Sequence, residues 1–248
     1  GSTLYYAGAQ SGCPRVRMLE ISENRAEVGF DDYKEPYDQQ QAVAEANRCL
    51  YCEDAPCITA CPTGIDIPKF IRKIATGAIW GSAQTIFDSN ILGMSCARVC
   101  PVEVLCVGDC VYNLMETPPI QIGKLQRYAT DIAFEKGWEY YEAGPDTGKS
   151  VALVGGGPAS LACAHELRRL GHSVTIYERD EVLGGLNTTG VAPYKMKADR
   201  SVEEVDWILS IGGIVVKTGV TVGRDIPWRE LEDKYDAIFL GMGLGPDK

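Results

Sequence analysis

Eight of the ten cysteines in this chain lie in two short stretches, and thiols at this density can hold metal. The first stretch, CLYCEDAPCITACP, contains four cysteines and closes on a proline: Cys49, Cys52, Cys57 and Cys61. The second stretch, CARVCPVEVLCVGDC, contains the other four: Cys96, Cys100, Cys106 and Cys110. We find no basic leader followed by an apolar segment, so a reducing compartment is expected, where clustered thiols more often bind metal than form disulfides.

The cysteine spacing favours iron–sulfur clusters. In a run of this kind one loop wraps three thiolates around one face of a cluster, and the cysteine before the proline ligates a second cluster, as in bacterial two-cluster ferredoxins. Zinc instead favours paired Cys-x2-Cys units, often completed by histidine. Only one such pair occurs, and His165 and His172 are remote from both stretches. We therefore expect two four-iron clusters whose ligands are exchanged between the stretches, with zinc and disulfides as the alternatives.

A glutamine lies on a helix face that should be buried. The segment 120–137 predicts a helix with an apolar face that includes Ile122, Leu125 and Ala129, and Gln126 falls on that face. A buried amide needs a hydrogen-bond partner. From the residues alone, a hydrogen bond to a loop carbonyl is the simpler interpretation.

A second kind of site is indicated by VALVGGGPAS. Gly155 and Gly157 follow a predicted strand and open a predicted helix, where the backbone can approach a pyrophosphate. In the dinucleotide-binding pattern G-x-G-x-x-G, Ser160 takes the place of the third glycine, and its side chain is still small. Glu178 follows Gly155 by 23 residues at the end of the next predicted strand, where an acid can accept ribose hydroxyls. Together these features predict a dinucleotide site.

Two domains are expected to position these sites. Residues 1–145 predict an all-α iron–sulfur domain with an extended amino-terminal arm, a short helix over 39–50, two helices within 66–90, a helix over 120–137, and cysteine-rich loops. A turn-rich segment, EAGPDTGKS, leads into residues 146–248, where strands alternate with helices. That alternation predicts a Rossmann-like domain with a parallel sheet.

Composition limits the partners. The net charge of −10 and the lack of a Lys/Arg-rich cluster argue against nucleic acid and anionic membrane. No run of eighteen apolar residues occurs, so no membrane span is expected, and we predict a cytoplasmic protein. The opening Gly1-Ser2 is interpreted as a cloning remnant.

At this point the sequence resembles a known family. Residues 29–136 are similar to the amino-terminal iron–sulfur region of dihydropyrimidine dehydrogenase and to the related glutamate synthase small subunit, through CLYCEDAPCITACPTGIDI, NILGMSCARVCPVEVLCVGDC and PIQIGKLQRYATD. The resemblance implies one cluster held by Cys49, Cys52, Cys57 and Cys110. It implies a second cluster held by Cys61, Cys100, Cys106 and Gln126. It leaves Cys96 as a small buried residue, and Gln126 favours the dihydropyrimidine dehydrogenase side.

The same resemblance extends to the dinucleotide site and favours FAD over NAD there. The segment ERDEVLGGL is similar to the flavin-binding stretch of these proteins. The implied FAD-binding residues are Gly155, Gly156, Gly157, Pro158, Ala159, Ser160, Glu178, Gly184, Gly185, Leu186 and Lys195. A second glycine fingerprint is absent, so the Rossmann-like domain is expected to be incomplete and the NAD(P)H-binding domain to lie outside this chain.

The resemblance implies a module that passes electrons from NAD(P)H through FAD and two clusters to another active site. That active site would belong to a partner subunit or domain, for example an FMN-containing one that reduces pyrimidines. We also expect an oligomer. No catalytic residue is assigned to this chain itself. The alternatives are an electron-input subunit of the glutamate synthase or bifurcating transhydrogenase type, and a non-catalytic iron–sulfur adaptor.

Overall fold

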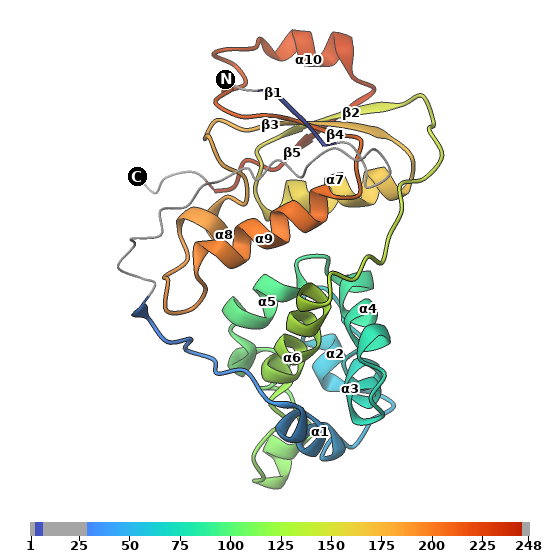
Figure 1. Cartoon of the computed structure of the whole chain (residues 1–248), viewed down its shortest axis with the longest axis vertical. Helices are drawn as coiled ribbons and strands as arrows, with labels where there is room; N and C mark the ends of the chain where they lie inside the picture. The colour runs from blue at the N-terminus through green and yellow to red at the C-terminus, as the bar shows by residue number, and fades with distance from the viewer. Residues whose placement is uncertain (1–2, 7–28, 245–248) are drawn as a thin grey trace. The chain divides into compact units, whose positions relative to one another are not determined.

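The computed structural model of the chain describes residues 3–6 and 29–244 (Figure 1). It contains two compact units. The helical unit comprises Asp31–Tyr140 and Tyr194–Met196, and the sheet unit comprises the other described residues.

The helical unit is built from six α-helices and two short 3-10 helices among its described residues. These are α1 (Gln39–Asn47), α2 (Pro56–Thr59), α3 (Ile67–Ala75), α4 (Ile79–Ser89), α5 (Gly93–Val99), η3 (Val102–Val104), η4 (Val111–Met115) and α6 (Ile122–Glu135). Their apolar faces meet in one core, which contains fully buried side chains from four helices: Phe70, Ile71, Ile74, Ile86, Met94 and Leu125.

Helix α3 forms where its sequence signals predict. The Asp66 side chain caps it by accepting a hydrogen bond from the Lys69 N–H at 3.2 Å, and Pro68 occupies the first turn. The helix ends before Gly77, whose φ of 77° is easily reached by glycine. The face that α3 buries includes Phe70 and Ile74, as the helical spacing requires.

Helix α6 confirms the apolar face predicted for residues 120–137, whereas α5 differs from the prediction. Ile122, Leu125 and Ala129 are all buried on α6. The second cysteine stretch was expected to be a loop, but its first part is helical, because α5 ends at Val99. Cys96 and Cys100 are four residues apart, which places them on one side of this helix end.

The sheet unit contains a parallel sheet, as predicted, with one additional antiparallel strand. The strands are β1 (Thr3–Tyr6), β2 (Ser150–Val154), β3 (Ser173–Tyr177), β4 (Ile214–Lys217) and β5 (Ala237–Leu240). Their order is β1-β4-β3-β2-β5, and β2 to β5 are all parallel. From β2 the chain adds β3 and then β4 on one side, and it later adds β5 on the other side of β2. Doubly wound folds bind ligands at such a reversal, here between β2 and β5.

Strand β1 was not predicted. Residues 1 to about 45 were expected to form an extended arm and a short helix, but Thr3–Tyr6 pairs antiparallel with β4, with Thr3 opposite Lys217. The rest of the expected arm, from residue 7 to 28, lies outside the described residues. The sheet therefore has a mixed rather than a purely parallel edge.

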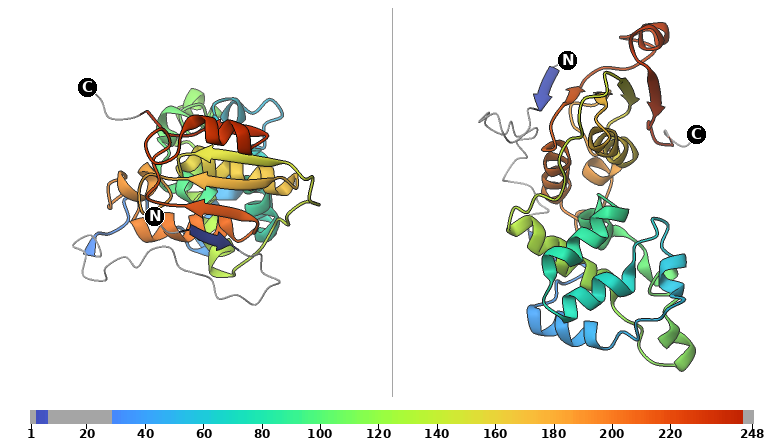
Figure 2. Two further views of the ribbon diagram at one scale, coloured as in Figure 1. Left: turned by 90° about the horizontal axis from the view of Figure 1, so that it is seen from above. Right: turned by 90° about the vertical axis from the view of Figure 1, so that its right-hand side faces the viewer.

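Helices cover both faces of the sheet. Helices α7 (Pro158–Arg169) and α9 (Ala198–Leu209) lie on one face and α10 (Trp228–Lys234) on the other, with the short α8 (Leu186–Thr189) beside α9 (Figures 1 and 2). The buried side of the sheet is apolar, with Leu153, Ile176 and Val216 fully buried. None of the described helices is long and apolar enough to span a bilayer.

Candidate functional site

Four cysteines from both stretches line one pocket in the helical unit. Three come from the first stretch and the fourth precedes η4: Cys49, Cys52, Cys57 and Cys110. The rest of the lining is mostly apolar and includes Ile67, Ile71 and Ile122. The structure thus brings together the four residues expected around the first cluster.

An unusual backbone conformation shapes this pocket. Tyr51 lies between Cys49 and Cys52 and has a φ of 50°, which is uncommon for a residue with a side chain. Its hydroxyl donates to the Ala46 carbonyl at 3.1 Å, and the Arg72 guanidinium lies 4.6 Å from its ring centroid. Such strained residues cost on the order of 1–3 kcal/mol and cluster at functional sites. The turn at Tyr51 is therefore held in place by its surroundings.

The thiols of this first group interact electrostatically. Burial, and after it the neighbouring Cys49, Cys110 and Cys52, raise the pKa of Cys57 to about 12. Burial also raises the pKa of Cys49, with added contributions from Cys52 and Cys110. Buried thiolates so close together require a positively charged centre to compensate them. Ferric and ferrous iron would provide one.

The second group contains Cys61, Cys100 and Cys106. Burial raises the pKa of Cys106 to about 12, and Cys61 is the charged neighbour with the largest effect on it. Cys100 is the C-cap residue of α5, and its thiol interacts electrostatically with Cys106 and Cys61. The three cysteines expected around the second cluster are therefore neighbours.

Cys96 also belongs to this neighbourhood. It is half-buried rather than fully buried, in contrast to the expectation. A hydrogen bond with Cys96 lowers the pKa of the Cys100 thiol. Their four-residue separation within a helix would have indicated this contact in the sequence.

Gln126 is a residue of α6, and it is almost completely buried, with 5% of its surface exposed. Its Nε2 donates to the Gly93 carbonyl on α5 at 2.9 Å. A hydrogen bond to a loop carbonyl was expected from the residues alone, and the acceptor is instead the carbonyl of the first residue of a helix. An amide donates hydrogen bonds through its nitrogen and accepts them through its oxygen. This bond uses Nε2, so it is compatible with Oε1 as a cluster ligand.

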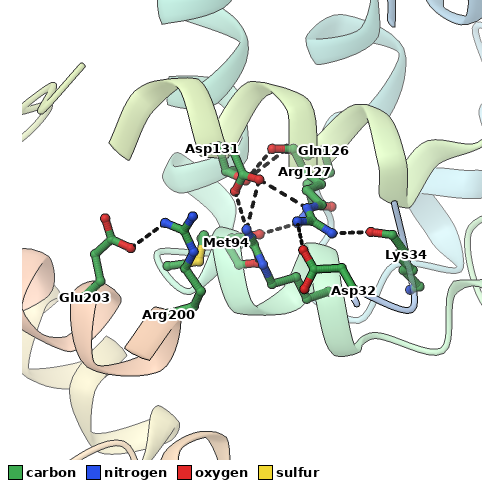
Figure 3. Close-up of polar contacts among 11 residues, drawn as sticks. Asp32, Lys34, Met94, Gln126, Arg127, Asp131, Arg200 and Glu203 are labelled. Atoms are coloured by element: carbon green, nitrogen blue, oxygen red, sulfur yellow. Dashed lines mark hydrogen bonds and ion pairs between the residues drawn. The ribbon is translucent and has the colours of Figure 1, made fainter. Parts of the chain in front are cut away.

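A network of buried charges joins α5 to α6 next to Gln126. Arg98 Nη2 contacts both oxygens of Asp131, at 2.7 and 2.9 Å. Arg127 Nε donates to the same carboxylate at 3.1 Å, and Arg127 Nη2 donates to Asp32 at 2.5 Å (Figure 3). The side chains of Arg98 and Arg127 are only 2% and 6% exposed. No local pattern in the sequence indicates this network, because Asp32 and Arg127 are 95 residues apart.

Replacing Asp131 with alanine should destabilise the helical unit strongly. The change leaves Arg98 buried without the carboxylate that it contacts and removes one partner of Arg127. Breaking a buried ion pair in this way costs about 3–5 kcal/mol. Chemical denaturation of the chain would measure the loss. Glu135→Gln removes an exposed carboxylate from the same helix and should change the free energy of unfolding by about 0.5 kcal/mol or less.

The glycine-rich turn lies at the switch point of the sheet. Gly155 follows β2, has a φ of 96°, and would place an added Cβ 2.5 Å from the Gly241 carbonyl oxygen beyond β5. Gly157 is the N-cap of α7, and Pro158 occupies its first turn. The N–H groups of the first helical turn are available to an anion, as in a pyrophosphate site. This geometry fits a dinucleotide.

Glu178 and the second glycine pair surround this turn. One Glu178 carboxylate oxygen accepts from the Gly156 N–H at 2.5 Å and the other from the Asp180 N–H at 2.9 Å. The Gly184 N–H donates to the Gly156 carbonyl at 2.8 Å. An added Cβ on Gly185 would lie 3.0 Å from the Gly157 Cα. Glu178, Gly156, Gly157, Gly184 and Gly185 are thus brought together.

The remaining expected FAD residues have varied surroundings. Ser160 is fully buried and packs against Gly241, so it serves close helix–strand packing. Ala159 lies in the first turn of α7. Leu186 is 75% exposed. Lys195 is exposed and belongs to Tyr194–Met196 of the helical unit.

Comparison with known proteins agrees with this geometry. Residues 25–138 match the family model described as dihydropyrimidine dehydrogenase domain II, 4Fe-4S cluster. The helical unit is an iron–sulfur domain of this type. Residues 153–206 match a model described as an NAD(P)-binding Rossmann-like domain. The resemblance expected from the cysteine spacing is therefore confirmed, and the Rossmann-like fold follows the iron–sulfur domain as predicted.

Curated relatives come from both of the families named above. The glutamate synthase [NADPH] small chain of Escherichia coli is 38% identical over 231 residues, which cover 93% of this chain and 48% of the relative. The NAD-dependent dihydropyrimidine dehydrogenase subunit PreT of the same organism is 37% identical over 215 residues, which cover 87% of this chain and 52% of the relative. The chain thus spans about half the length of these relatives.

Proposed function

We propose that this chain is an electron-transfer module of an NAD(P)H-dependent oxidoreductase of the dihydropyrimidine dehydrogenase type. It would hold FAD at the glycine turn and two four-iron clusters at the two cysteine groups. The observation that carries this proposal is the pocket lined by Cys49, Cys52, Cys57 and Cys110, whose members come from both stretches. With its cofactors bound, such a chain would transfer electrons one at a time. The reaction of the substrate itself would take place in a partner.

The arrangement of the thiols supports clusters over zinc. Among the described residues, no three Cys, His, Asp or Glu side chains are grouped closely enough to hold a single metal ion. Zinc ligands lie about 2.3 Å from the ion and must converge tightly. Thiols that share a pocket without converging on one point suit a larger cluster of iron and sulfide.

The protein contributes apolar surroundings, hydrogen bonds and charges. The apolar lining of the first group excludes water, which influences the reduction potential of a cluster. At the glycine turn, the first N–H groups of α7 would face the pyrophosphate, and the Glu178 carboxylate would face the ribose. FAD when bound would accept a hydride as an electron pair and release single electrons.

A redox titration of anaerobically prepared chain tests this proposal. The visible spectrum should show flavin bands over broad iron–sulfur absorption, and stepwise reduction should bleach the flavin bands and produce the EPR signals of reduced clusters. Iron–sulfur absorption without extractable flavin, even after addition of FAD, would instead support the non-catalytic adaptor.

The role of Gln126 as a cluster ligand leads to a separate prediction. A neutral amide in place of a thiolate removes negative charge from the cluster and should raise its reduction potential. Gln126→Cys or Gln126→Glu should therefore lower the potential of one cluster by about 59 mV or more, a tenfold change in a one-electron equilibrium. EPR-monitored titration would measure this shift. Gln39→Glu makes the same charge change at an exposed position of α1 and should leave both potentials in place; equal potentials in all three variants would remove Gln126 from the ligand set.

A glutamate synthase type of electron-input subunit is the second candidate, because the small chain of that enzyme is 38% identical to this chain. Gln126 favours the dihydropyrimidine dehydrogenase type by resemblance. Reconstitution with a pyrimidine-reducing partner or a glutamate-forming partner would discriminate between the two.

A further inference from the structure

Lys34 places a positive charge beside the second cysteine group. Its Nζ donates to the Cys100 carbonyl at 2.8 Å, across 66 residues of sequence. The carbonyl and the sulfur belong to the same residue, so the ammonium group lies near the Cys100 thiol and its charge acts on that thiol. After the hydrogen bond with Cys96, this positive charge is a further influence that lowers the pKa of Cys100.

The segment that carries Lys34 is held in place by Arg127. Arg127 Nη1 donates to the Lys34 carbonyl, and Nη2 donates to Asp32 two residues earlier (Figure 3). Arg127 is in turn fixed by Asp131, which also binds Arg98. The position of Lys34 therefore depends on the buried network described above.

The charges of this network do not cancel. Arg98 and Arg127 are paired with the carboxylates of Asp131 and Asp32. The ammonium group of Lys34 contacts a carbonyl instead, and within the described part of the chain no carboxylate forms an ion pair with it. One positive charge thus remains uncompensated beside Cys100.

We propose that Lys34 sets the reduction potential of the cluster held by the second cysteine group. This inference rests on the proposed function, because it requires that cluster to bind. Uptake of one electron gives the cluster one more negative charge, and an adjacent cation in a partly buried site stabilises the reduced form. Lys34 therefore raises the potential of this cluster, and Arg127 acts as a positioning residue for Lys34.

The test is an EPR-monitored redox titration of the anaerobically prepared chain. Lys34→Gln should lower the equilibrium constant for reduction of one cluster by about tenfold, which is about 59 mV for one electron, and leave the other cluster unchanged. Lys34→Arg keeps the charge and should retain the parent potential. Arg127→Gln should shift the same cluster in the same direction. Lys136→Gln removes an exposed charge about 15 Å along α6 from Gln126 and should shift neither.

Iron and acid-labile sulfide content distinguishes the possible failures. If the parent and Lys34→Gln both carry two clusters and their potentials agree, Lys34 is only a structural anchor and this inference is wrong while the proposed function stands. An equal shift in both clusters, or in Lys136→Gln, would also overturn it. If the parent carries only one cluster, the proposed function fails and this inference fails with it.

Discussion

Replacing Cys110 with alanine should remove about half of the iron from the chain. Cys110 comes from the second stretch but lines the pocket formed by the first, so it is expected to complete the first cluster. Alanine cannot ligate iron, and a cluster with three thiolate ligands is exposed to loss. Iron content should fall from about eight to about four atoms per chain. The melting temperature should fall as well, because ligand binding to the native state contributes to folding stability.

Two other cysteines provide matched controls for this loss. Cys163 lies on α7 of the sheet unit, and Cys163→Ala should retain all of the iron. Cys96 is the stricter control, since it contacts Cys100 and yet is expected to stand outside both ligand sets. Full iron content in Cys110→Ala, or a loss of half in Cys96→Ala, would contradict the ligand assignment.

Gly157→Ala should weaken FAD binding at least about tenfold, which is about 1.4 kcal/mol, without disturbing the fold. Gly157 has a φ of −80°, which alanine adopts easily, and an added Cβ would meet nothing closer than 4.0 Å. The space that the methyl group fills lies at the N-terminus of α7, where a pyrophosphate must approach the backbone closely. Titration of flavin-free chain with FAD, followed by flavin fluorescence, would measure the affinity.

The neighbouring glycine gives a different result for a steric reason. An added Cβ on Gly156 would lie 2.2 Å from Leu183 Cδ2, so Gly156→Ala should lower the melting temperature of the flavin-free chain. An added Cβ on Gly29 would meet no atom of the described residues within 4 Å, so Gly29→Ala should affect neither property. An unchanged FAD affinity in Gly157→Ala would show that this turn is structural and that the dinucleotide binds elsewhere.

The sequence predicted best those elements whose signals are local. Helix α3 combined a capping Asp66, an early Pro68 and a regular apolar spacing, and the structure confirms each of these features. The strands β2 to β5 were predicted as short apolar segments between helices. The two cysteine stretches were also evident from their short internal spacing, whereas the placement of Cys110 in the first group and of Cys61 in the second came from the family resemblance.

Elements that depend on distant contacts were missed. Strand β1 is only four residues long, and it pairs with β4 more than 200 residues later in the sequence. Helix α10 buries a single side chain, Leu231, so it shows no helical period. Helix α5 was hidden by its cysteine and its glycine, since the cysteine stretch that begins within GMSCARV was interpreted as a ligand loop.

The surroundings of the second cysteine group were the least predictable part of the candidate site. Lys34 reaches Cys100 across 66 residues, and Arg127 reaches Asp32 across 95. Charged residues this far apart carry no common pattern, and an isolated lysine in a polar segment is normally a solvated side chain. The packing of the segment 32–34 against α5 and α6 brings these groups together.

Chemical analysis of the anaerobically purified chain for iron, acid-labile sulfide and zinc tests most directly whether the cysteines hold iron–sulfur clusters. We expect about eight iron atoms and about eight sulfides per chain, with little zinc. A colourless protein, or one that binds zinc without sulfide, would contradict the assignment of both cysteine groups.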